Sequence, residues 1–152
     1  MVKFSLCFCA FLLTIIEPEF VLLIEKQGEV IFEKRLEEPF FSLVFIHSVE
    51  KTKVEERFRI EPNGEMLLYE CRYSSYGAGL PSDIGGGFAL EDGEFVLKLD
   101  RKFERITLRV SHIDGHGIVF RDGPVWFKSI ANVGDTLTFY VKPKLSKRSK
   151  IF

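Results

Sequence analysis

The chain has 152 residues, of which 46% are hydrophobic and 28% charged, so it can form one packed domain and lacks the composition of a disordered protein. Its 21 Lys and Arg against 22 Asp and Glu leave a net charge of -1. This balance argues against a nucleic-acid binder that works by neutralising phosphates.

The amino-terminal segment is typical of an export signal. Lys3 precedes an uncharged run over residues 4–16, which Glu17, Pro18 and Glu19 close. The apolar region of a signal peptide spans roughly 7 to 15 residues, whereas a membrane-spanning helix needs about 20. No small-x-small cleavage site precedes Glu17, so a cleaved signal and an uncleaved anchor both stay open, with a buried first strand as the structural alternative. We assign residues 1–18 to a signal peptide or signal anchor and expect an extracytoplasmic protein, membrane-anchored or secreted.

The rest of the chain alternates short apolar runs with turn residues such as Asn63-Gly64 and Asp92-Gly93. No helical periodicity is sustained for three turns, and the 16 Phe favour strands. We therefore predict an all-β fold, an antiparallel β-sandwich or open barrel of about 8 to 10 short strands. The domain covers residues 19–142, and residues 143–152 form a basic tail. Expected strands lie at 20–25, 30–36, 40–48, 54–61, 66–74, 94–100, 106–113, 118–120, 125–128 and 136–142.

The register of the third and fourth strands is predicted from face alternation. A four-residue loop over residues 50–53 pairs Phe45 with Phe58 and places His47 opposite Glu56. Apolar residues then meet apolar partners along this face. His47 and Glu56 are its one polar pair.

The Asn63-Gly64 turn predicts the register of the next hairpin. It pairs Glu56 with Cys71 on the apolar face, and on the other face it sets Arg57 against Glu70 and Glu55 against Arg72. His47, Glu56 and Cys71 then lie in a row across three strands. The His47–Glu56 pair is interpreted either as a structural pair that fixes register or as part of a functional site.

Two sequence blocks resemble a known family. The block HSVEKTKVEE over residues 47–56 and the block YGAGLP over residues 76–81 are similar to those of the family called domain of unknown function 1850, in which an HS-V-x-x-T-P-V-x-E block precedes a G-A-G-L-P block. Lys53 replaces the proline of the family pattern. The functional candidates, from the two blocks and from the tyrosines that follow the hairpin, are His47, Ser48, Thr52, Glu56, Tyr73, Tyr76, Gly79 and Pro81.

The resemblance implies a role in transport and no catalytic mechanism. Members of the family often occur beside permease components of TRAP transporters of the TAXI type. The resemblance therefore implies a non-catalytic accessory or binding protein, with a TRAP-type permease or solute receptor as partner. We expect no cofactor.

Two enzymatic alternatives and one structural alternative stay open. A small hydrolase or a metal-dependent enzyme could use His47 and Glu56, and the hydrolase would take Ser48 as its nucleophile, although adjacent residues point to opposite faces of a strand. His112 and His116 flank a turn and are weak candidates for metal ligands. The third alternative is a purely structural envelope protein.

Overall fold

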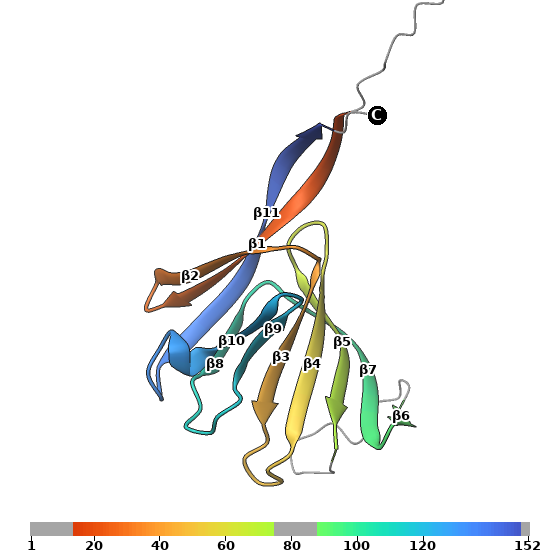
Figure 1. The fold of residues 1–152 in the computed structure, drawn as a ribbon, viewed down its shortest axis with the longest axis vertical. Helices are drawn as coiled ribbons and strands as arrows, with labels where there is room; N and C mark the ends of the chain where they lie inside the picture. The colour runs from red at the N-terminus through yellow and green to blue at the C-terminus, as the bar shows by residue number, and fades with distance from the viewer. Residues whose placement is uncertain (1–13, 75–87, 150–152) are drawn as a thin grey trace, which may run out of the picture.

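The computed structural model describes residues 14–74 and 88–149, which form antiparallel strands and one 3-10 helix, η1 (Phe127–Ser129) (Figure 1). The strands are β1 (Thr14–Lys26), β2 (Glu29–Leu36), β3 (Phe40–Ile46), β4 (Lys53–Ile60), β5 (Met66–Tyr73), β6 (Phe88–Glu91), β7 (Glu94–Phe103), β8 (Ile106–Arg109), β9 (Gly117–Phe120), β10 (Gly123–Trp126) and β11 (Thr136–Ser149).

The strands form two sheets that pack face to face. One has the order β2-β1-β11-β8 and the other the order β10-β9-β3-β4-β5-β7-β6. The predicted all-β sandwich is confirmed, and the described strands form no closed barrel. Each expected strand overlaps an observed one, and β6 is the strand that the sequence did not predict, because its four residues carry little alternation.

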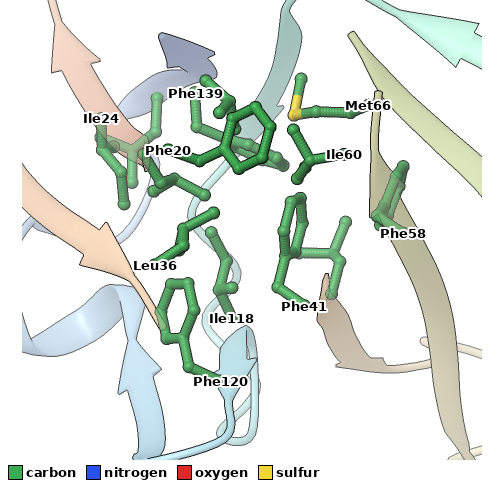
Figure 2. Close-up of a cluster of buried hydrophobic side chains, with 14 of the residues drawn as sticks. Phe20, Ile24, Leu36, Phe41, Phe58, Ile60, Met66, Ile118, Phe120 and Phe139 are labelled. Atoms are coloured by element: carbon green, nitrogen blue, oxygen red, sulfur yellow. The ribbon is translucent and has the colours of Figure 1, made fainter. Parts of the chain in front are cut away.

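The core between the sheets is rich in phenylalanine (Figure 2). Phe41 stacks on Phe58 with ring centroids 5.0 Å apart, and Phe139 from the smaller sheet meets the Phe41 ring edge-on at 6.1 Å. Phe20 and Ile24 of β1 add to the same cluster. Such contacts contribute about 0.5–1.5 kcal/mol each beyond area burial, and they hold the two sheets in one relative position.

The terminal strands pair with each other along all of β1. Their ends form a two-stranded ribbon that projects away from the sandwich (Figure 1). β1 begins at Thr14, inside the segment 1–18 expected to be a signal or anchor, and β11 runs to Ser149, through most of the expected basic tail. The folded part of the chain therefore extends past both predicted boundaries of the 19–142 domain.

The β4–β5 hairpin has the predicted register over its first half. Glu55 lies opposite Arg72 and Arg57 opposite Glu70, and the Arg57–Glu70 ion pair has an N···O distance of 2.9 Å. A bulge after Arg57 then shifts the pairing by one residue, so that Phe58 faces Leu68 rather than Tyr69. The bulge keeps Leu68 in the core.

The outer face of this sheet carries a ladder of ion pairs centred on Glu70, whose surface is 3% exposed. Its carboxylate accepts from Arg57, from Arg72 at 2.6 Å and from the Lys98 ammonium. Burial raises the pKa of Glu70, but the hydrogen bonds from Lys98 and Arg72 outweigh it and hold the pKa below its usual value. Glu70 therefore stays charged at neutral pH.

The predicted register of β3 against β4 is wrong by four residues. Phe41 faces Phe58, and Glu56 faces Leu43 instead of His47. The connection is longer than expected, because β3 ends at Ile46 and the turn occupies residues 47–52. A shift of four residues leaves every side chain on the same face, so alternation alone could not distinguish the two registers.

Candidate functional site

His47 lies in the turn beyond the end of β3. Its backbone N–H donates to the Thr52 carbonyl at 2.8 Å, its own carbonyl accepts from Lys51 N–H at 2.9 Å, and its Nδ1 accepts from Glu50 N–H at 3.3 Å. Lys51 takes the left-handed conformation, with φ of 56°. The histidine is thus built into the turn, with its Nδ1 engaged as an acceptor.

Glu56 occupies the inner face of the larger sheet, as predicted, but without His47 opposite. Its neighbours across the strands are Leu43 and Cys71. His47 lies four residues past Leu43, which corresponds to roughly 13 Å along the strand direction. The predicted row of His47, Glu56 and Cys71 is therefore corrected to Leu43, Glu56 and Cys71.

The surroundings of Glu56 are apolar. Val54, Cys71 and Leu97 form a buried cluster on this face. Burial raises the pKa of the Glu56 carboxyl, against a smaller opposing effect from the positive charge of Arg101. Burial and the charge of Glu56 together raise the pKa of the Cys71 thiol to about 12, so Cys71 is a poor nucleophile at neutral pH.

The remaining candidates of the first block lie near the turn. Ser48 and Val49 are exposed, and Thr52 Oγ1 is buried with no hydrogen-bond partner among the described residues. Because β3 ends before His47, strand alternation no longer separates His47 from Ser48. The register nevertheless removes Glu56 as the acid opposite His47, so the geometry gives the predicted hydrolase arrangement no support.

Tyr73 is part of the packed interior rather than of an open surface. It is 1% exposed, and its ring lies 5.6 Å from that of Phe95. Tyr76, Gly79 and Pro81 lie outside the described residues. The structure therefore brings Glu56 and Tyr73 to one face of the larger sheet and places His47, Ser48 and Thr52 at the adjoining turn.

The two histidines considered for metal binding have separate roles. His116 packs edge-on against Phe127 at 4.8 Å, and its Nδ1 accepts from Ser111 N–H at 3.3 Å. Burial lowers the pKa of His116, which favours its neutral form. The His112 carbonyl accepts from Lys128 Nζ. No group of three or more metal-ligating side chains is found in the part of the chain that the structure describes.

The protein is thus a small β-sandwich. The inner face of its larger sheet carries the Glu56 carboxyl, and the turn at one end of that sheet contains the first part of the 47–56 sequence block. The chain belongs to the family of the domain of unknown function (DUF1850), whose model matches residues 41–125, more than half of the chain. This range runs from β3 to β10 and includes the 47–56 block. Comparison with curated proteins gave no match, and neither did comparison with solved structures.

Replacing Glu56 by glutamine is expected to stabilise the protein at pH 7. A carboxyl whose pKa is raised by folding stabilises the folded state below its unfolded pKa of about 4.5, and that contribution is lost as the pH rises through the folded pKa. Glu56→Gln has no carboxyl to ionise and so avoids this loss of stability. The excess of its free energy of unfolding over that of the wild type should therefore shrink as the pH falls towards 4.5. Urea unfolding across this pH range measures the difference.

Glu37, an exposed carboxyl before β3, is the control position for the same change. Glu37→Gln should change the free energy of unfolding at pH 7 by no more than about 0.5 kcal/mol, as surface substitutions usually do. A Glu56→Gln protein that is less stable than the wild type at pH 7 would show that the charged carboxylate makes a favourable contact, which contradicts this account.

Proposed function

We propose that this protein is a non-catalytic accessory or binding protein that works outside the cytoplasmic membrane, held there by its amino-terminal segment and associated with TRAP-type solute uptake. Its partner is a permease or a solute receptor of such a transporter. The transport part of the proposal rests on the family membership, because members of this family often occur beside permease components of TRAP transporters.

The observation that carries the proposal is the ribbon of β1 and β11. β1 begins at Thr14, inside the uncharged run over residues 4–16, and the ribbon leads from there into the sandwich (Figure 1). A paired ribbon between an apolar segment and a folded body can connect a membrane tether to the domain. No helix among the described residues is long and apolar enough to cross a membrane. The tether of this proposal is the apolar stretch that precedes the ribbon in the chain.

The larger sheet supports a binding role. Its inner face places one carboxyl, Glu56, among apolar side chains, next to a turn whose residues follow the family pattern. A polar group among apolar side chains can orient a ligand or partner, and Glu56 is the residue to which we assign this role. Catalysis by acid and base would need a second group within hydrogen-bond reach.

The location is tested by protease accessibility in intact and in osmotically shocked cells. Full-length protein carrying a carboxyl-terminal epitope should sediment with membranes and should be degraded when protease reaches the outside of the cytoplasmic membrane. A matched cytoplasmic protein should survive the same treatment. Protection of the epitope until the cytoplasmic membrane is dissolved would contradict the proposed location.

A further inference from the structure

A hollow lies on the outer face of the smaller sheet, where the ribbon joins the sandwich. Because Leu22 and Ile24 are in the core, alternation places Val21 and Leu23 on this opposite face. The hollow has a volume of about 320 Å³. It is lined by Val21, Leu23, Glu33, Lys142, Pro143 and Lys144.

The lining combines an apolar floor with a basic rim. Leu23 is 7% exposed at the floor, whereas Lys142 and Lys144 are exposed at the rim. The Lys142 ammonium lies 5.5 Å from the centre of the Tyr140 ring. Such a lining suits a molecule that has an anionic head next to an apolar part.

The charges around the hollow leave it positive. Glu19 pairs with Arg35 at 2.5 Å, and Glu25 pairs with Arg105. Glu33 is the remaining acid at the rim, against two lysines. Lys144 forms no ion pair within the described ranges, so its charge is available to an external anion.

The direction of the ribbon decides how this face could meet a membrane. Val21 lies seven residues after Thr14, which corresponds to about 23 Å along an extended strand. An upright ribbon would hold the lysines far beyond the Debye length of about 8 Å at physiological ionic strength. A ribbon lying along the surface would bring them into contact with the headgroups.

We propose that the ribbon lies flat on the membrane surface with this face down, and that the hollow receives the headgroup of an anionic phospholipid. Lys142 and Lys144 donate to the phosphate oxygens from the rim, while the carbon atoms of the headgroup beyond the phosphate contact Val21 and Leu23 at the floor. The inference rests on the tether of the proposed function. It adds to that function the orientation of the β-sandwich on the membrane and the class of lipid that it contacts.

The test is acetylation of lysines in the full-length protein incorporated into lipid nanodiscs. Discs of phosphatidylcholine alone are compared with discs that also contain phosphatidylglycerol, and modification is followed by mass spectrometry of peptides. Lys142 and Lys144 should react several-fold more slowly in the anionic discs, and high salt should abolish the difference. Lys51 and Lys53, exposed at the far turn, should react equally in both kinds of disc.

The possible outcomes distinguish a failure of the proposed tether from a failure of the proposed lipid contact. A chain that does not co-elute with discs contradicts both. Co-elution with equal rates for Lys142 and Lys144 in the two discs contradicts the lipid contact and leaves the tether standing. Protection by inorganic phosphate in phosphatidylcholine discs would identify a site for soluble anions and would overturn the choice of a lipid. A doubly substituted Lys142→Gln/Lys144→Gln protein should co-purify with less phosphatidylglycerol than the wild type.

Discussion

Replacing Gly64 by alanine is expected to lower the free energy of unfolding by about 3 kcal/mol. Gly64 ends the β4–β5 turn with φ of +92°, a conformation that costs a residue with a Cβ about 1 kcal/mol. A Cβ at this position would also lie 2.8 Å from the Val141 carbonyl oxygen and 2.9 Å from Pro143 Cδ. Backbone of β11 cannot yield cheaply there, because it pairs with β1 along the base of the ribbon.

The matched control for this prediction is Gly93→Ala in the β6–β7 turn. Gly93 has a similar φ of +81°, but no atom lies within 4 Å of its Cβ position. Gly93→Ala should lower the free energy of unfolding only by the cost of placing a Cβ-bearing residue at positive φ, about 1 kcal/mol. Urea unfolding of both proteins measures the difference. Equal losses in the two would contradict the close approach between the β4–β5 turn and β11.

Replacing Glu70 by glutamine is expected to cost about 2 kcal/mol. The change keeps the shape of the side chain but leaves Arg57, Arg72 and Lys98 without the carboxylate that they share. Removing one partner from a fully buried ion pair costs about 3–5 kcal/mol. The loss should be smaller here because the side chain of Lys98 is 57% exposed.

The matched control is Glu61→Gln. Glu61 pairs with Arg59 at 3.0 Å, and the Arg59 side chain is 52% exposed, so the change should cost at most about 0.5 kcal/mol. Salt at 0.5 M should reduce the effect at Glu61 more than the effect at Glu70. Equal costs at the two positions in urea unfolding would show that the Glu70 ladder contributes no more than an ordinary surface pair.

The ladder also determines how the protein responds to acid. Burial raises the pKa of Glu55, but hydrogen bonds from Lys53, Arg57 and Ser42 outweigh it and lower the pKa to about 2. A carboxyl with a lowered pKa contributes stability above its unfolded pKa of about 4.5, and this is lost as the pH falls towards the folded pKa. Lowering the pH therefore removes stability that Glu55 and Glu70 contribute, whereas it removes the destabilising effect of the ionised Glu56 carboxyl.

The sequence predicted local pairing better than the connections between distant strands. The Asn63-Gly64 turn correctly predicted the β4–β5 hairpin and the pairing of Arg57 with Glu70, although the pairs between the turn and the bulge after Arg57 are shifted by one residue. The β3–β4 register could not be determined in the same way, since its turn contains six residues and one of them, Lys51, adopts a positive φ. The stacking of Phe41 on Phe58 is visible only once the two strands are aligned.

The candidate site was predicted correctly in its face and incorrectly in its partner. Glu56 does lie on the apolar face beside Cys71, as alternation required. Its pairing with His47 depended on the loop length, which the sequence left undetermined. The contact between Lys98 and Glu70 was missed because it depends on β5 pairing with β7, and no short turn joins these strands. The ribbon was missed for the same reason, since β1 and β11 come from opposite ends of the chain.

Recovery of a transport component with the protein tests the central proposal most directly. Full-length chain with a carboxyl-terminal tag is expressed in its own cells, cross-linked briefly and purified from solubilised membranes. A TRAP-type permease subunit or solute receptor should be enriched over a purification from cells with an unrelated membrane-tethered protein carrying the same tag. Recovery of neither component, from membranes in which both are present, would contradict the proposed role in solute uptake.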